Sequence, residues 1–303
     1  MRIIRRRGWE IAESQVTPES AVLNRRSLLG GSAALLAAAP GLAHAEPNAK
    51  YAPGRALTEE KYATTYNNYY EFSDSKNLWR QAQGMKTSPW TIEFAGMVKQ
   101  PRKIAFEDLL KQVAVEERIY RHRCVEAWAM TVPWTGFPMA ELLRIAEPLA
   151  SAKYLAFETG QDKAMAGLNE PMYPWPFIDG LAIDEAANEL AFITTGMYGK
   201  PLPPQNGAPL RVTTPWKYGF KQVKAVVKVT FTETQPRCFW HDILPNEYGF
   251  WANVNPAVSH PRWSQADERL LGVDETVPTQ IYNGYGDFVA SLYSNRKSEK
   301  LFM

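Results

Sequence analysis

The 303-residue chain is poor in the side chains that build protein-only metal centres, with 2 Cys and 4 His. Only His122, His241 and His260 follow residue 45, and none is spaced with another His or Cys as zinc ligands are. The sequence also contains no C-x-x-C, H-E-x-x-H, G-x-G-x-x-G or G-x-S-x-G pattern. It therefore lacks the signatures of zinc peptidases, dinucleotide-binding folds and serine hydrolases.

The chain also lacks a large excess of charge of either sign. Lys and Arg number 34 and Asp and Glu number 32, and residues 1–45 contain six Arg and three Glu. Without those residues the balance is 34 − 6 = 28 against 32 − 3 = 29, a net charge of −1. This balance gives no reason to expect binding to nucleic acid or to an anionic membrane.

Residues 1–45 have the features of an export signal. Arg25 and Arg26 precede an apolar run over 28–39, and Ala43-His44-Ala45 matches an A-x-A cleavage site. The paired arginines predict export of the folded protein to the periplasm by the twin-arginine route, with cleavage after Ala45. The alternative is an N-terminal membrane anchor, although this run is shorter than the roughly 20 residues that span a bilayer.

The remaining sequence predicts a linker over 46–65 and a single domain over 66–303. Alternation of apolar and polar residues predicts strands, and helical spacing predicts short helices. We expect an α+β fold with a mixed, mostly antiparallel sheet and long ordered loops. The expected strands are 90–96, 117–123, 154–159 and 222–231, the expected helices are 106–113 and 139–146, and the prolines of 133–138 are expected to break the chain.

The segment 121–128, Arg-His-Arg-Cys-Val-Glu-Ala-Trp, places Cys124 at the end of an expected strand. Flanking positive charge lowers the pKa of a thiol, and the thiolate is the form that binds metals or attacks as a nucleophile. A metal held mainly by an organic cofactor needs few protein ligands, and a soft thiolate suits such a metal. Two alternatives stay open, a disulfide between Cys124 and Cys238 and a cysteine nucleophile activated by His260.

Glu126 follows Cys124 by two positions, so in an extended segment both side chains lie on one face. Its carboxyl group is a candidate proton donor beside the metal. An ion pair between Glu126 and Arg121 or Arg123 is the competing interpretation.

Several long motifs resemble those of a known family. The sulfite-oxidase-like molybdopterin proteins share the patterns at 121–128, 202–209 and 215–221. The patterns at 66–72, 253–256 and 260–266 are more similar to the catalytic subunits of bacterial periplasmic protein-methionine-sulfoxide reductases. The resemblance covers the chain from about Tyr66 to its C-terminus.

This resemblance implies a monomeric catalytic domain with a sulfite-oxidase-like fold, binding one molybdenum through a single molybdopterin without nucleotide. It implies that Cys124 is the protein's metal ligand, and we expect Asn68 to line the substrate side. Arg211 and Lys224 suit a terminal phosphate, and Asn206 suits a pterin edge. The implied cofactor contacts are Asn67, Tyr70, Glu71, Thr159, Asn206, Arg211, Gln222, Val223 and Lys224.

The implied activity is the reduction of free and protein-bound methionine sulfoxide, which repairs oxidised periplasmic proteins. The family draws its electrons from a membrane haem partner linked to quinol. A sulfite-oxidising dehydrogenase is the alternative of the same class, and it would direct arginines such as Arg121 and Arg123 at the metal. An alternative of another class is a non-catalytic cofactor-binding module with Cys124 in a disulfide.

Overall fold

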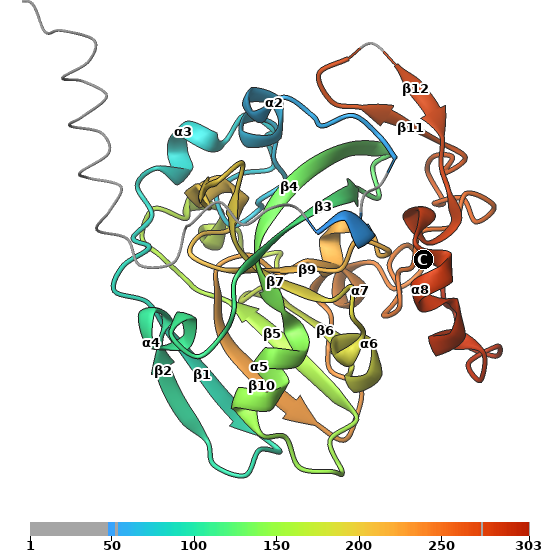
Figure 1. Cartoon of the computed structure of the whole chain (residues 1–303). Coiled ribbons are helices and arrows are strands. Elements are labelled where there is room, and N and C mark those ends of the chain that lie inside the picture. Colours follow the sequence, from blue (N-terminus) through green and yellow to red (C-terminus); the bar gives the residue numbers. More distant parts are fainter. Residues whose placement is uncertain (1–47, 52–53, 274, 303) are drawn as a thin grey trace, which may run out of the picture. The chain divides into compact units, whose positions relative to one another are not determined.

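The computed structural model describes residues 48–51, 54–273 and 275–302 (Figure 1). The predicted export signal and its cleavage site lie outside the described residues. No helix of the described ranges has the length and apolar character needed to cross a membrane.

A five-stranded sheet has the order β2-β1-β10-β5-β6. Its strands β1 and β10 run parallel, and its other neighbours are antiparallel. The bounds are β1 Thr91–Gly96, β2 Arg102–Ala105, β5 Tyr154–Thr159, β6 Ile178–Ala182 and β10 Val226–Thr232.

A seven-stranded sheet has the order β12-β11-β4-β7-β8, with β3 paired to β4 and β9 paired to β7. Strands β11 and β4 are parallel, and its other described pairs are antiparallel. The bounds are β3 Glu116–Arg123, β4 Trp128–Pro138, β7 Phe192–Met197, β8 Lys200–Pro201, β9 Arg211–Thr213, β11 Asp267–Leu270 and β12 Thr276–Pro278.

The helices of the described ranges are short, which confirms the α+β prediction with mixed sheets. The α-helices are α2 Glu60–Thr65, α3 Trp79–Ala82, α4 Phe106–Leu110, α5 Met139–Ala146, α6 Ile183–Ala187, α7 Phe239–Ile243 and α8 Gly286–Val289. The 3-10 helices are η3 Ala49–Tyr51, η4 Ala166–Asn169, η5 Pro204–Asn206, η6 Gly219–Lys221, η7 Ile281–Gly284 and η8 Ala290–Tyr293.

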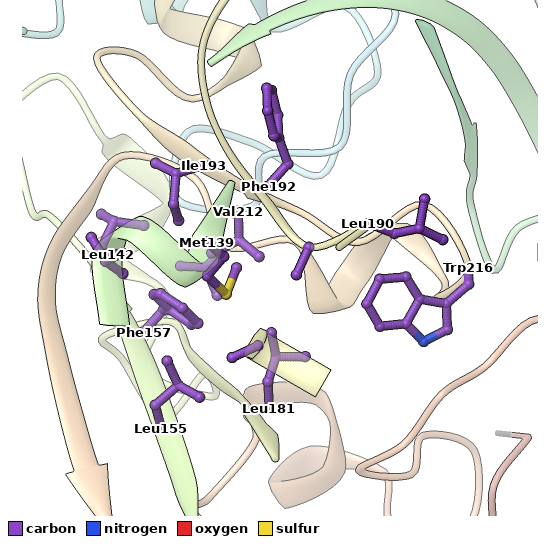
Figure 2. Packing of buried hydrophobic residues seen from close by; sticks show 14 of the residues in the cluster. Met139, Leu142, Leu155, Phe157, Leu181, Leu190, Phe192, Ile193, Val212 and Trp216 are labelled. Carbon is purple, nitrogen blue, oxygen red and sulfur yellow. The ribbon is translucent and has the colours of Figure 1, made fainter. Parts of the chain in front are cut away.

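Helix α5 has the bounds that its sequence predicts. Met139, Leu142 and Ile145 recur at three-residue spacing and are buried, so one stripe of the helix faces the core. The helix ends at Glu147, which adopts a left-handed conformation with φ 51°. Figure 2 shows Met139 and Leu142 packed with side chains from both sheets, among them Phe157 of β5 and Ile193 of β7.

Strand β4 contradicts the prediction that the prolines over 133–138 break the chain. The carbonyl oxygen of Pro133 accepts a hydrogen bond from Tyr198 N at 3.0 Å, on the edge of β4 that faces β7. A strand residue directs its N and its C=O to the same edge. Pairing with β7 begins only at Trp134, so no ladder bond is lost at Pro133.

Strand β10 begins four residues later than the predicted strand over 222–231. Ala225 has a positive φ of 47°, which interrupts the extended conformation just before Val226. Residues 222–224 follow η6 and form a loop instead of a strand. This loop is free to direct its side chains and main chain at a pocket, as described below.

Part of the segment predicted as a linker packs on the domain. Asn48 N donates to Glu117 O at 3.0 Å, and Tyr51 and Ala63 are buried in a hydrophobic cluster that extends to Leu301. The 46–65 segment lacks an apolar period, but single aromatic and small residues are enough to anchor it. Its described residues therefore differ from a solvated linker.

Candidate active site

The turn between β3 and β4 presents Cys124. The two strands pair antiparallel up to Arg123 and Ala129, and Cys124 N donates to Trp128 O at 2.9 Å. Ala127 closes the turn with φ 61°, and its N donates to Cys124 O at 3.1 Å. The prediction that a strand ends at Cys124 is confirmed.

The sulfur of Cys124 is buried and accepts hydrogen bonds from two N–H groups. Asn68 Nδ2 and Glu126 N each lie 3.5 Å from Sγ. Burial raises the pKa of the Cys124 thiol to about 12, and the charge of Glu126 raises it further. The charge of Arg123 lowers this pKa as expected, but burial outweighs it, so a bound metal would be what holds the sulfur as a thiolate.

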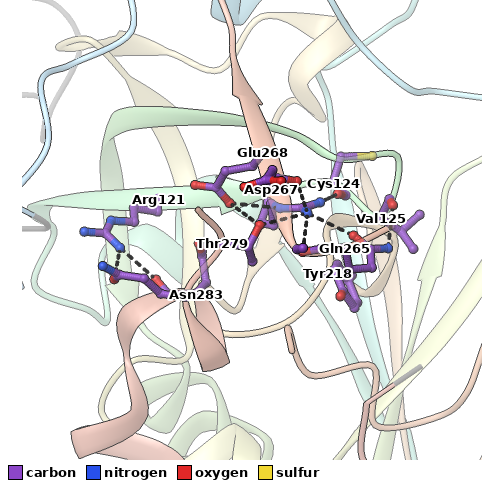
Figure 3. Close-up of polar contacts among 12 residues, drawn as sticks. Arg121, Cys124, Val125, Tyr218, Gln265, Asp267, Glu268, Thr279 and Asn283 are labelled. Carbon is purple, nitrogen blue, oxygen red and sulfur yellow. Dashed lines mark hydrogen bonds and ion pairs between the residues drawn. The ribbon is translucent and has the colours of Figure 1, made fainter. Parts of the chain in front are cut away.

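The two arginines beside Cys124 have partners away from its sulfur. Arg123 is fully buried and pairs with Glu268, with Nε 2.9 Å from Oε2. Arg121 donates to Gln280 Oε1 at 2.5 Å and lies within 3.4 Å of Asn283 O (Figure 3). Neither arginine pairs with Glu126, so the competing interpretation of Glu126 is wrong.

The partner of Glu126 is Lys76, which the sequence analysis missed. Lys76 Nζ lies 2.7 Å from Glu126 Oε2, and both side chains are about one-quarter exposed, at 26% and 28%. Asn68 Nδ2 donates to the same oxygen at 3.2 Å, and Trp128 Nε1 donates to it at 3.4 Å. The carboxylate is held 4.0 Å from the Cys124 sulfur, although Val125 and Glu126 form a turn instead of the extended segment on which the sequence prediction rests.

One pocket gathers every site residue that the sequence analysis named. These residues come from the 67–71 loop, the β3–β4 turn, the end of β5, η5, β9 and the 222–224 loop. The pocket-lining residues among them are Asn67, Asn68, Tyr70, Glu71, Cys124, Glu126, Thr159, Asn206, Arg211, Gln222, Val223 and Lys224.

Further side chains line the same pocket without having been predicted. His122, Trp128 and Met130 could have been found, because alternation places them on the Cys124 face of the β3–β4 hairpin. The others come from loops without a local pattern. The additional lining residues are Tyr69, His122, Val125, Trp128, Met130, Phe177, Gly219, Phe220, Trp240 and Tyr248.

Two buried cations, Lys224 and Arg211, line this pocket. Lys224 Nζ donates to the main-chain oxygens of Asn68 and Gln205, at 2.8 and 2.9 Å, and Arg211 donates to Asn206 O at 3.0 Å. Neither forms an ion pair with a described carboxylate. Burial lowers the pKa of Arg211 to about 10 and that of Lys224 well below its ordinary value. An anionic group in the pocket would offset this cost.

Two asparagine side chains that line the pocket have amide oxygens without a hydrogen-bond partner within the described ranges. Asn67 Nδ2 and Asn206 Nδ2 both donate to Ala63 O, at 3.5 and 3.0 Å. Their Oδ1 atoms are buried and have no hydrogen-bond partner in the described chain, and the same holds for Tyr69 OH. Buried polar groups are normally paired, so these atoms fit a polar heterocycle such as a pterin. The residues present therefore fit a phosphorylated pterin cofactor.

Protein side chains alone do not form a metal centre in the described ranges. No three His, Cys, Asp or Glu residues there are grouped to hold a metal ion. Cys124 and Cys238 are both free, so the predicted alternative of a disulfide between them is wrong. A single sulfur ligand fits a metal whose other ligands come from an organic cofactor.

His260 does not serve as a base for Cys124. Its ring stacks on Trp263 with centroids 3.8 Å apart, and its Nδ1 accepts from Arg262 N at 3.2 Å. Its Nε2 faces Glu247 Oε2 at 3.3 Å. It lines a separate small cavity rather than the Cys124 pocket, so the alternative of a Cys–His nucleophile is wrong.

Comparison with known proteins first shows which class of protein this chain belongs to. Residues 80–240 match the family of the oxidoreductase molybdopterin binding domain. The chain is thus an oxidoreductase with a molybdopterin-binding domain, and its pocket has the cations and polar atoms that such a cofactor needs.

Full-length relatives narrow the assignment. The catalytic subunit MsrP of the protein-methionine-sulfoxide reductase of Burkholderia mallei is 45% identical, over 97% of this chain and 96% of the relative. The corresponding subunit of Pseudomonas syringae pv. tomato is 46% identical, over 95% and 96%. The chain belongs to this family of reductase catalytic subunits. The sulfane dehydrogenase SoxCD of Paracoccus pantotrophus matches at 17% identity and a TM-score of 0.42, over 50% of this chain and 40% of that one.

Proposed function

We propose that this chain is a molybdenum-dependent reductase that converts free and protein-bound methionine sulfoxide to methionine. The observation that carries the proposal is the convergence of Cys124, Arg211, Lys224 and the unpartnered amide oxygens in one pocket of a chain from this reductase family. The net reaction takes up two electrons and two protons and releases the sulfoxide oxygen as water.

The cofactor is a molybdenum–molybdopterin with one pterin and no nucleotide. Arg211 and Lys224 would hold its phosphate, and Asn67 and Asn206 would bind the pterin through their free Oδ1 atoms. Tyr70, Thr159 and the 222–224 segment complete the pterin contacts, and Cys124 would ligate the metal. When bound, the cofactor supplies the two-electron oxygen-transfer chemistry.

The chain's own residues supply orientation and a proton. Asn68 donates both to the Cys124 sulfur and to Glu126, so it fixes the carboxylate next to the metal ligand. Glu126 delivers a proton when the sulfoxide oxygen leaves as water. The partly exposed Lys76 holds Glu126 in this position.

The deciding experiment is a pair of assays on purified, cofactor-loaded protein. We expect a reduced dye to be oxidised with methionine sulfoxide, and we expect no oxidation of sulfite with an electron acceptor. Cys124→Ser should abolish sulfoxide reduction and lower the molybdenum content. Full metal-dependent activity of Cys124→Ser would contradict the assignment of the ligand.

The sulfite-oxidising alternative lacks support from the arginines beside Cys124. A sulfite dianion requires cations at the metal, yet Arg123 pairs with Glu268 and Arg121 donates to Gln280. The pocket that contains Cys124 is lined by the rings of Trp240 and Tyr248, which suit a thioether.

The proposal also covers the electron donor of the enzyme and the cellular compartment in which the enzyme works. We infer that a membrane haem subunit linked to quinol reduces the enzyme, since the sequence has no haem-attachment motif of its own. The twin-arginine pattern supports export to the periplasm, where the substrates would be oxidised periplasmic proteins. Replacing Arg25 and Arg26 by Lys should retain the protein in the cytoplasm, which fractionation and immunoblotting would measure.

A further inference from the structure

Four of the aromatic side chains that line the pocket contact one another, and one of them, Tyr70, is also a proposed pterin contact. They are Tyr70, Phe220, Trp240 and Tyr248, here called the aromatic wall. The ring centroids of Tyr70 and Trp240 are 4.8 Å apart, those of Trp240 and Tyr248 are 5.4 Å apart, and those of Phe220 and Tyr248 are 5.1 Å apart. The rings therefore form one continuous surface, although they come from separate segments of the chain.

Tyr248 has an unused polar group in this wall. The residue is only 6% exposed, yet its hydroxyl has no hydrogen-bond partner among the described residues. Its contact with His241 is through the main-chain carbonyl oxygen, 2.6 Å from His241 Nδ1. The hydroxyl oxygen is not among the fully buried polar atoms of the described residues that lack a partner, so the hydroxyl reaches the open space of the pocket, where it can donate to a ligand that accepts a hydrogen bond.

The phenol of Tyr248 is a hydrogen-bond donor in the pocket that Cys124 and Glu126 also line. Burial raises its pKa to about 12, with smaller effects of Arg262, Glu247, Cys124 and Glu126. The hydroxyl is therefore protonated at neutral pH.

A methyl sulfoxide has the two features that this surface complements. Its polar oxygen accepts hydrogen bonds, and its sulfur and methyl group pack favourably against aromatic rings. The product thioether keeps the sulfur and the methyl group but has lost the oxygen. A hydroxyl donor therefore distinguishes the substrate from the product, whereas the rings bind both.

We propose that the aromatic wall is the sulfoxide subsite, with Tyr248 donating a hydrogen bond to the sulfoxide oxygen and Trp240 packing against the sulfur and its methyl group. This assignment rests on the proposed function. Tyr248 binds and orients the substrate and transfers no proton, which is the role proposed for Glu126. Loss of the hydrogen bond on reduction then favours release of the methionine product.

The test measures binding without turnover. Cofactor-loaded, oxidised enzyme is titrated calorimetrically with methionine sulfoxide and, separately, with methionine. We expect Tyr248→Phe, which keeps the ring, to bind the sulfoxide about 3- to 10-fold more weakly and methionine as the wild type does. Trp240→Leu should weaken binding of both ligands.

The matched control is Tyr173→Phe. Tyr173 contacts the rings of Tyr70 and Trp240 but does not line the pocket, so loss of its hydroxyl should change neither affinity. Unchanged sulfoxide binding by Tyr248→Phe, or an equal loss of both ligands, would overturn the assignment. A different result would contradict the proposed reductase activity. In that case the wild-type protein would contain molybdenum and bind methionine sulfoxide, but it would not reduce the sulfoxide with electrons from the dye.

Discussion

At the scale of single residues, the position of one carboxylate decides how the Cys124 pocket can work. Glu126 could have paired with either flanking arginine, which would have removed it from the pocket. Both arginines are instead engaged elsewhere, and Lys76 holds Glu126 beside the Cys124 sulfur. Proton delivery and positioning can therefore be tested by separate substitutions.

Glu126→Gln should lower turnover by about 100-fold or more, because general acid catalysis typically contributes factors of this size. The amide keeps the shape and can still bond to Asn68 and Trp128, but it is no proton donor. Steady-state assays with methionine sulfoxide measure the effect, and molybdenum analysis serves as the control. Wild-type turnover at unchanged molybdenum content would exclude Glu126 as the proton source.

Lys76→Met should lower turnover by about 10-fold, as is typical of residues that orient groups next to a metal ligand. Lys76→Arg should restore most of the activity, since its guanidinium can still bond to the carboxylate. In a Glu126→Gln background the Lys76→Met change should have little further effect. Additive losses in the double variant would show that Lys76 acts independently of Glu126.

At the scale of elements, the β4–β7 pairing holds the hairpin that carries Cys124. The register shifts between Thr135 and Gly136, where β4 bulges. A Cβ atom at Gly136 would lie 2.1 Å from Ile193 O, so the two strands approach closely only because glycine lacks this atom. This contact explains a glycine inside a long buried strand.

Gly136→Ala should lower the free energy of unfolding by about 1–3 kcal/mol, since overpacking forces the strands apart. The control is Gly286→Ala in α8, where the nearest atom to the added Cβ lies 3.7 Å away. That change should be neutral or slightly stabilising. Denaturant unfolding of both variants measures the difference, and equal stabilities would contradict the role of the close approach.

Secondary structure near the site was predictable where the pattern is local. The bounds of α5 and β5 follow from apolar spacing, and the end of β3 at Cys124 follows from alternation. The path of β4 through Pro133 was not predictable, because it depends on where a distant strand begins to pair. The late start of β10 depends likewise on the loop that closes the pocket.

At the scale of the whole molecule, the pocket lowers the stability of the cofactor-free protein. Burial places Arg211, Lys224 and Glu71 in an environment that disfavours their charged forms. A bound anion would relieve the two cations. Cofactor binding and folding stability are therefore linked.

Glu71 gives this linkage a pH dependence. Burial raises the pKa of Glu71 from 4.5 to about 7, although Lys224 lowers it somewhat. The folded protein then binds the Glu71 proton more tightly than the unfolded chain does. The contribution to stability is fully present below pH 4.5 and is lost as the pH rises to about 7.

Across that range the cofactor-free protein should lose about 3 kcal/mol of unfolding free energy through Glu71. Glu71→Gln, which cannot ionise, should lack this component, and comparing the two proteins cancels the titration of other groups. Chemical unfolding at a series of pH values measures it. Parallel pH profiles of wild type and variant would contradict the raised pKa.

The sequence by itself determined several local elements and, through its long motifs, pointed to Cys124 and to the polar residues that meet in the pocket. It could do so because alternation, helical spacing and long motifs are properties of neighbouring residues. Only the tertiary structure decided that Arg121 and Arg123 lie away from the Cys124 sulfur, that Lys76 holds Glu126, and that the aromatic wall faces the same pocket. Those outcomes depend on which distant segments meet, and no local pattern encodes such contacts.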